Sequence, residues 1–228
     1  MSKLGLSNNQ LKIIAMITMA MDHVGLVLLP QVTWLRILGR LAFPIYAFMI
    51  AEGCKHTRNL FRYFCSVFLM AGLCQVVSYF VLGSLLMCVL VTFSLSIFLI
   101  AILKQAQKKE SFFWTLLLIA GICGAYFVCE ILPDMLPGTD FYVDYGFLGV
   151  MLPLALYVAK DKPGKMTVLI LGLTCMATFF GGLLWWSLLA APLLLLYNGR
   201  RGKAKMKWFF YFFYPVHLVI IQGLAYIL

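Results

Sequence analysis

Nine long apolar segments, joined by short polar connections, constrain this chain more than any other feature. They lie at residues 11–30, 35–53, 60–82, 85–103, 112–131, 145–159, 166–181, 183–197 and 208–228. Roughly 20 apolar residues form a helix that crosses ~30 Å of hydrocarbon. Of the 228 residues 64% are hydrophobic and only 11% are charged, which excludes an ordinary soluble globule, a disordered chain and a disulfide-stapled secreted module. We therefore expect an all-α, polytopic integral membrane helix bundle with about nine transmembrane helices, forming one domain over residues 1–228.

The polar connections alternate in charge along the chain. Cations gather in every second connection, in five groups: Lys3 and Lys12; Lys55, Arg58 and Arg62; Lys104, Lys108 and Lys109; Lys160, Lys162 and Lys165; and Arg200, Arg201, Lys203, Lys205 and Lys207. The intervening connections lack cations, and the longest carries Asp134, Asp140 and Asp144. The positive-inside rule then places the N-terminus in the cytoplasm and the C-terminus outside the plasma (inner) membrane. The net charge of +10 records this orientation and does not indicate nucleic acid binding.

Two further patterns refine this description. The stretch from residue 166 to residue 197 is too long for one crossing, and Gly181 and Gly182 predict a break that turns it into a hairpin of two short arms. The seven cysteines show no paired or metal-type spacing. We interpret them as free, soft packing residues and predict no metal site.

A few ionisable residues lie inside the predicted spans, where each costs about 2.5–3.5 kcal/mol. They are Asp22 and His23 in the first span, Arg36 and Arg40 in the second, and His217 in the last. Arg36 and Arg40 share one helical face because they are four residues apart. Three helices would thus contribute to one polar cluster, with Asp22 neutralising an arginine. A purely structural ion pair with snorkelling arginines stays open as the alternative.

Spacing also links the cytoplasmic side to the middle of the bilayer. Lys12 and His23 are eleven residues apart, which puts them on one helical face with ~16 Å between them along the axis. A coenzyme A ester fits this spacing, with its phosphates at Lys12 and its thioester at His23. Arg58 and Arg62, four residues apart, are further candidates for one phosphate group. Any other anionic substrate that enters from the cytoplasm fits this spacing as well. As a further alternative, Lys12, Arg58 and Arg62 only set the orientation of the chain in the membrane.

Four motifs, in this order, resemble the TraX family. They are LKIIA…MDHVG over residues 11–25, GRLAFP over residues 39–44, AEG…TRN over residues 51–59, and FYFFYPVHL over residues 210–218. A looser match is DYGFLG over residues 144–149. TraX proteins are polytopic membrane proteins named for the conjugative factor that N-acetylates the amino terminus of F-type pilin. The Lys12–His23 spacing is also similar to an arginine–histidine signature of membrane O-acyltransferases, with lysine in place of arginine.

These resemblances imply an acetyl-CoA-dependent transmembrane acyltransferase, which acetylates an amine or hydroxyl at the outer half of the membrane. The acceptor they suggest is a pilin amino terminus, a cell-surface glycan or another small molecule. We predict a catalytic group of His23, Asp22, Arg40 and His217, in which His23 is the general base. For coenzyme A the expected residues are Lys12, Glu52, Thr57, Arg58 and Arg62, and for the acceptor Arg36 and Tyr214. Direct transfer and an acyl-histidine route both stay open.

Two other classes of function compete with this hypothesis. A proton-coupled transporter would use Asp22, His23 and His217 as a relay, although the chain shows no repeated halves or paired broken helices. A non-catalytic membrane scaffold would not need the polar cluster at all.

Overall fold

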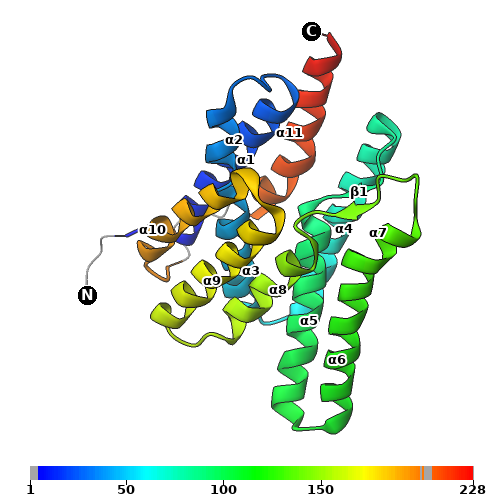
Figure 1. The fold of residues 1–228 in the computed structure, drawn as a ribbon. Helices are drawn as coiled ribbons and strands as arrows, with labels where there is room; N and C mark the ends of the chain where they lie inside the picture. The colour runs from blue at the N-terminus through cyan, green and yellow to red at the C-terminus, as the bar shows by residue number, and fades with distance from the viewer. Residues whose placement is uncertain (1–4, 201, 203–206, 228) are drawn as a thin grey trace. The chain divides into compact units, whose positions relative to one another are not determined.

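A computed structural model describes residues 5–200, 202 and 207–227 of the chain (Figure 1). The helices of its first part are α1 (Asn8–Val27), α2 (Thr33–Gly39), α3 (Ala42–His56), α4 (Leu60–Leu82) and α5 (Val89–Lys109). Next come α6 (Phe112–Tyr126), the π-helix η1 (Phe127–Ile131), α7 (Leu132–Met135), α8 (Gly146–Val158) and α9 (Lys162–Phe180). The 3₁₀ segment η2 (Gly182–Leu189), α10 (Ala190–Leu195) and α11 (Lys207–Ile227) follow, and the two short strands are β1 (Leu86–Met87) and β2 (Tyr142–Val143).

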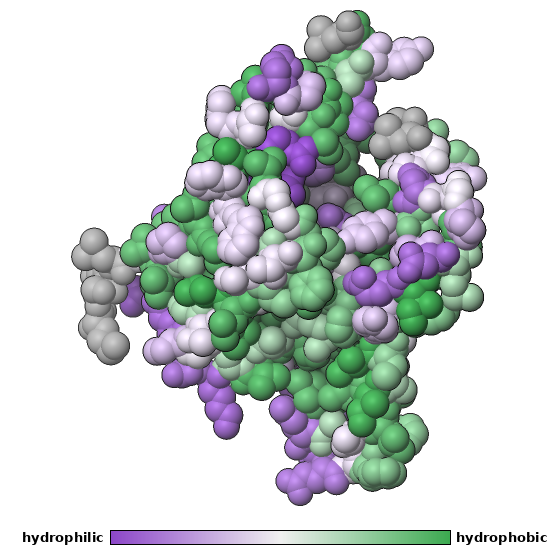
Figure 2. Space-filling model, viewed as in Figure 1, coloured by the Kyte–Doolittle hydropathy of each residue, from purple (hydrophilic) through white to green (hydrophobic). Residues whose placement is uncertain are grey.

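The predicted all-α membrane class is confirmed. Among the described residues, six helical segments are long and apolar enough to cross a membrane, and three shorter apolar segments lie at Gly146–Val158, Gly182–Leu195 and Phe212–Ile227. Together they correspond to the nine apolar segments of the sequence. Large apolar side chains such as Leu69, Phe112 and Phe179 are mostly exposed, and hydrophobic residues dominate the face in Figure 2. Such a surface suits lipid and not water. The orientation of the termini stays a prediction.

The chain forms two compact units, and we describe each by itself. The first comprises Met1–Met49 with Asp161–Leu228, and the second comprises Ile50–Lys160. The first unit contains α1, α2, α9, η2, α10 and α11, and the second contains α4 to α8 with both strands; α3 begins in one and ends in the other.

The second apolar segment is broken, whereas its sequence predicted one continuous span. A turn at Arg40 and Leu41 separates α2 from α3. Pro44 explains the break, because it has no N–H to donate to the Arg40 carbonyl and its ring crowds that same carbonyl. Arg40 therefore lies at the end of a short helix instead of in the interior of a long one.

The predicted hairpin between the seventh and eighth segments is confirmed. Both Gly181 and Gly182 have positive φ angles, 69° and 57°, which side-chain-bearing residues rarely adopt. Helix α9 ends there, and η2 with α10 forms the returning arm.

Hydrogen bonds hold three basic connections together at one end of the first unit. The Leu6 N–H donates to the Leu196 carbonyl at 2.8 Å, and the Asn8 N–H donates to the Arg200 carbonyl at 2.8 Å. The Lys162 ammonium donates to the Leu195 carbonyl at 2.5 Å. This agrees with the predicted common side for these connections. Lys3, Arg201, Lys203 and Lys205 of the predicted basic groups lie outside the described residues.

The second unit has an acidic end opposite the basic end of α5. Lys108 and Lys109 occupy the last turn of α5. At the other end, β1 pairs in parallel with β2, and Asp140 accepts hydrogen bonds from the Ser84 hydroxyl at 2.5 Å and from the Leu85 N–H at 2.9 Å. The two ends of α5 therefore differ in charge as the alternating connections predicted.

We expect Asp140 to hold the connection between α4 and β1 in a pH-dependent way. The hydrogen bonds from Ser84 and Leu85 lower the pKa of the exposed Asp140 carboxyl. Because this pKa is lowered by folding, the bonds persist above the ordinary aspartate pKa and are lost as the pH falls through the lowered value. Hydrogen exchange at neutral pH should be faster at Leu85 in Asp140→Ala than in the wild type, and the two should converge in acid. Asp134→Ala, in the nearby helix α7, should exchange like the wild type; a similar acceleration in both variants would contradict the assignment.

Candidate active site

Helix α1 carries two of the predicted catalytic residues near its C-terminal end. Its start is fixed by a capping box, in which the Ser7 N–H donates to the Gln10 side-chain oxygen at 2.8 Å and Ser7 in turn caps Gln10. Leu11, Ala15 and Met19, spaced at four residues, form its buried face. Asp22 and His23 follow directly and are partly exposed.

Asp22 pairs with both arginines that the sequence placed on one helical face. Its Oδ1 atom lies 3.1 Å from Arg36 Nε, and its Oδ2 atom accepts a hydrogen bond from Arg40 Nη2. The side chains of Arg36 and Arg40 are only 23% and 16% exposed. Two cations and one carboxylate thus form a partly buried triad with one net positive charge.

Two glycines allow α1 and α2 to approach closely enough for this triad. A Cβ atom on Gly39 would lie 2.3 Å from the Cβ atom of Asp22, and one on Gly25 would lie 2.8 Å from that of Leu35. Neither position has space for a side chain. This role of Gly25 and Gly39 was not predicted from the sequence, although both lie in the quoted motifs. The available signal was a small residue on each of two neighbouring helices.

His23 meets His217, which α11 provides. The Nδ1 atom of His23 lies 2.9 Å from the Met19 carbonyl, and that of His217 lies 2.8 Å from the Phe213 carbonyl. The Nε2 atom of His217 lies 3.3 Å from Nδ1 of His23. Since a carbonyl only accepts, both Nδ1 atoms are assigned as N–H donors. The His217 Nε2 lone pair then faces the His23 Nδ1–H, and His23 Nε2 is the nitrogen that can take up a proton.

Aromatic rings fix this histidine pair. Phe213 stacks on His217 with ring centroids 4.9 Å apart, and Tyr214 meets both imidazoles edge-on at 6.4 and 5.5 Å. Tyr214 and His217 are buried. Helix α11 therefore adds Phe213, which the sequence argument missed; its four-residue spacing from His217 was the available signal.

The predicted coenzyme A residues are divided between the two units. Lys12 lies on α1, which is one continuous helix from Lys12 to His23, so their shared face is retained. Glu52, Thr57, Arg58 and Arg62 belong to the second unit. Glu52 is buried and lies 3.5 Å from His56 Nε2. The site that these five residues would form stays a prediction.

Arg58 and Arg62 are both exposed, but helical spacing does not orient them as predicted. Arg58 precedes Asn59, whose side-chain oxygen caps α4 by accepting the Arg62 N–H at 2.9 Å. Because Arg58 lies outside the helix, the four-residue interval does not align the two guanidinium groups. For both guanidinium groups to bind one phosphate, the conformation of the loop before α4 would have to bring them together.

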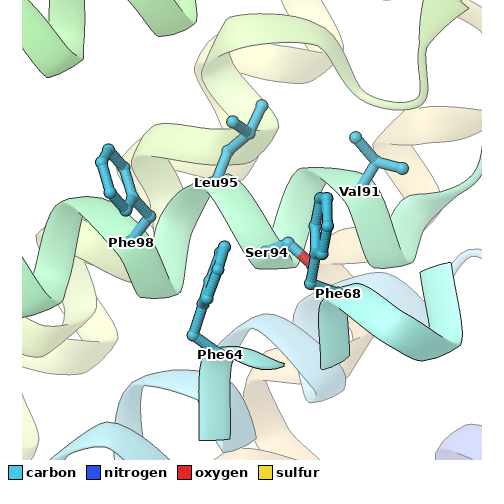
Figure 3. Close-up of a pocket in the computed structure, with 6 residues that line it drawn as sticks. All are labelled: Phe64, Phe68, Val91, Ser94, Leu95 and Phe98. Atoms are coloured by element: carbon cyan, nitrogen blue, oxygen red, sulfur yellow. The ribbon is translucent and has the colours of Figure 1, made fainter. Parts of the chain in front are cut away.

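A hollow between α4 and α5 offers no comparable chemistry. It has a volume of about 230 Å³ and is lined by Phe64, Phe68, Val91, Ser94, Leu95 and Phe98 (Figure 3). The Ser94 hydroxyl donates to the Leu90 carbonyl of its own helix at 2.7 Å. Such a lining suits hydrocarbon. Within the described residues, no three His, Cys, Asp or Glu side chains gather as metal ligands.

Comparison with known proteins gives matches along almost the whole chain. A family model described as "TraX protein" matches residues 7–225. A "Probable fimbrial assembly protein FimC, serogroup H1" from Dichelobacter nodosus is 27% identical over 236 residues, covering 93% of each chain. An uncharacterized protein from Rickettsia prowazekii (strain Madrid E) is 50% identical over 38 residues, or 17% of this chain and 15% of that one. No solved structure matches the chain.

We predict that Gly39→Ala destabilises the first unit. The added methyl group would overlap Asp22 and force α1 away from α2, at a cost of about 1–3 kcal/mol. Gly72→Ala is the matched control, because nothing lies within 4 Å of a Cβ atom at this position in α4. Denaturant titration in detergent micelles should show a lower midpoint for Gly39→Ala, and an unchanged or higher one for Gly72→Ala. Equal midpoints for the two variants would rule out close α1–α2 packing.

Asp22→Asn should destabilise the fold more strongly than either arginine substitution. It leaves two cations in a partly buried place without their counter-ion, at a cost of about 3–5 kcal/mol. Adding Arg40→Gln should restore part of the unfolding free energy, because it removes one uncompensated charge. A double-mutant cycle measures this coupling. Strict additivity of the two substitutions would show that Asp22 and Arg40 do not interact.

Proposed function

The chain belongs to the TraX family, and from this premise we propose that it is a membrane-embedded acetyltransferase. In this proposal it moves an acetyl group from cytosolic acetyl-CoA to an amine or hydroxyl at the outer half of the inner membrane. One observation carries the proposal: His23, which contacts His217 of α11, lies at the same end of α1 as Asp22, the carboxylate that holds two arginines. This combines a base with positive charge, the two requirements of acyl transfer.

His23 is the proposed general base. Its Nε2 atom would take the proton from the acceptor amine or hydroxyl as the acceptor attacks the thioester carbonyl. The Nδ1–H of His23 faces His217 Nε2, so His217 can accept this hydrogen bond and stabilise the imidazolium that forms. His217 is thus a positioning residue, comparable in role to the third member of a catalytic triad.

Arg40 and Arg36 supply the positive charge in this proposal. A guanidinium has five N–H donors, so it can hold Asp22 and still donate to a second oxygen. Negative charge that develops on the thioester oxygen would be stabilised by these donors, most strongly in a site with little water. When the C–S bond breaks, His23 returns its proton to the leaving thiolate. An acyl-histidine route with the same residues remains an alternative for kinetics to decide.

The proposed donor and acceptor reach this site from opposite sides. Lys12 lies about three helical turns from His23 on α1, the reach that an extended pantetheine arm requires. Glu52, Thr57, Arg58 and Arg62 are proposed as further contacts of coenzyme A, and Tyr214 with Arg36 as contacts of the acceptor. A relative is named as a probable fimbrial assembly protein. A pilin amino terminus is therefore the first acceptor to test, followed by cell-surface glycans.

The decisive experiment measures acetyl transfer by the purified protein in nanodiscs. Labelled acetyl-CoA and a pilin amino-terminal peptide should give acetylated peptide and free coenzyme A in equal amounts. We expect His23→Ala to lower the rate about 10²–10⁴-fold. His217→Ala should lower the rate less and shift its pH dependence, because His23 loses the partner of its Nδ1–H. Thr178→Ala is the control, because that hydroxyl bonds only its own helix, at the Cys175 carbonyl. Its rate should equal that of the wild type.

Two results would contradict the proposal. A full rate in folded His23→Ala would remove His23 as the base. Proton-coupled solute uptake into proteoliposomes, without any release of coenzyme A, would favour a transporter that uses the same residues. Binding of radiolabelled acetyl-CoA, weakened by Lys12→Ala, would support the donor site independently of the acceptor chosen.

A further inference from the structure

Arg36 has hydrogen-bond donors that its ion pair does not use. It meets Asp22 through its Nε atom, which lies 3.1 Å from Oδ1. Within the described residues, no hydrogen bond involves either Nη atom of Arg36, and only its Nε is a buried atom without a hydrogen bond. The Nη atoms therefore reach the surface. A guanidinium has five N–H donors, so those on the Nη atoms can bind a ligand while Nε stays at Asp22.

The aliphatic part of Arg36 is fixed against α1, which lies beside α2 in Figure 1. A Cβ atom on Gly25 would lie 3.3 Å from both Cγ and Cδ of Arg36, so these methylene groups cross α1 where it has no side chain. The Nε atom beyond them is buried, and the exposed 23% of the side chain includes its Nη end. A planar guanidinium that is already held in place loses little freedom when it binds an anion.

The first unit has no second carboxylate near this arginine. Asp22 carries one negative charge for Arg36 and Arg40, so the triad has one net positive charge. The other acidic residue in the sequence of this unit is Asp161, the N-cap of α9 beside Lys162 at the basic end. That end lies about 20 Å away along α1. A partly buried charge is stable when it is paired, so the triad is suited to a ligand with one negative charge.

This charge lies close to the connection between α1 and α2. Arg36 follows Thr33, the first residue of α2, by three residues. In the connection, Leu29, Pro30 and Gln31 are exposed. It is one of the connections without cations, and the positive-inside rule places it on the extracytoplasmic side. An anion from that side can therefore reach Arg36 at the end of the α1–α2 pair.

The proposed base lies within the reach of one small molecule from Arg36. Asp22 and His23 are neighbours on α1, with Cα atoms ~3.8 Å apart and side chains ~100° apart around the helix. Arg36 contacts Asp22 directly. A molecule whose nucleophile is at His23 can thus place a second group at Arg36, a few bonds further along its own chain.

We propose, on the basis of the acetyltransferase function above, that the acceptor carries a carboxylate and that Arg36 binds this group while His23 takes the proton of the acceptor amine or hydroxyl. The two oxygens of a carboxylate match the fork of N–H donors on a guanidinium. Its single charge balances that of the triad. A phosphodiester has the same charge, but every phospholipid headgroup carries one, so it would not distinguish an acceptor from the bilayer.

The test compares acceptors that differ only in this charge. The purified protein in nanodiscs receives labelled acetyl-CoA with 4-aminobutanoate, 5-aminopentanoate or 6-aminohexanoate, or with the primary amide of each. Rates are compared at equal concentrations of unprotonated amine. At the best chain length we expect kcat/KM to be about 10- to 100-fold higher for the carboxylate than for its amide, the value of a hydrogen-bonded charge. Hydroxy acids and their amides form a parallel series for a hydroxyl acceptor.

Arg36→Gln should bring the ratio of carboxylate to amide close to one. It leaves Asp22 and Arg40 as a neutral pair, and a loss of rate common to both acceptors does not affect the ratio. Arg36→Lys keeps the charge without the fork and should give an intermediate ratio. Lys108→Gln is the matched control, because it removes an exposed cation from the last turn of α5. Its ratio should equal that of the wild type.

The possible failures are distinguishable. Equal kcat/KM for carboxylate and amide in an active wild type, or an unchanged ratio in Arg36→Gln, would overturn the carboxylate site and leave acetyl transfer intact. If no compound is acetylated, the acetyltransferase function fails, and binding decides on the carboxylate site. At constant ionic strength, butanoate but not butanamide should then raise the thermal unfolding midpoint of the wild type and leave that of Arg36→Gln unchanged. Equal effects of the two compounds would overturn the site.

Discussion

The ion triad of Asp22, Arg36 and Arg40 is the interaction on which the arrangement of the first unit depends. Charges in a poorly hydrated interior are costly unless they are paired and hydrogen-bonded. One carboxylate serves two arginines here, and this requires α1 and α2 to lie closer than ordinary side chains allow. Gly25 and Gly39 make that approach possible. The break that Pro44 imposes also leaves Arg40 at the end of α2, so α2 is a short helix whose arginines both face α1.

The histidine pair is stabilised by hydrogen bonds and ring contacts and not by ion pairing. A neutral imidazole carries no charge to compensate, but both of its nitrogens still require partners. Each histidine donates to the carbonyl four residues earlier, and the remaining contact joins α1 to α11. The pair is therefore oriented by its own helices and by aromatic rings rather than by the neighbouring charges. In the proposed reaction, His23 held in this way would serve proton transfer, and the arginines held by Asp22 would stabilise charge.

Prediction from sequence succeeded where a single element determines the outcome. The apolar segments, the hairpin at Gly181 and Gly182 and the distribution of cations all follow from local hydrophobicity, backbone freedom and charge. The polar residues within the spans were identified for the same reason, since ionisable groups are rare in hydrocarbon. The sequence predicted that His23 and His217 belong to one polar cluster, but it did not predict their direct contact, because almost two hundred residues separate them.

By itself, the sequence determined that this chain is a helical membrane protein of the TraX family, with a small set of charged and imidazole side chains within its apolar segments. Hydropathy and motifs suffice for this, because they depend on each residue and its near neighbours. The tertiary structure decided which of these side chains meet: Asp22 with two arginines, and one histidine with another. It did so through contacts between helices. The spacing of α1 and α2 depends on Gly25 and Gly39, which have no side chains, and α2 ends one turn before Pro44 because of that proline. Such contacts arise only when distant segments pack together, and no periodicity within one segment records them.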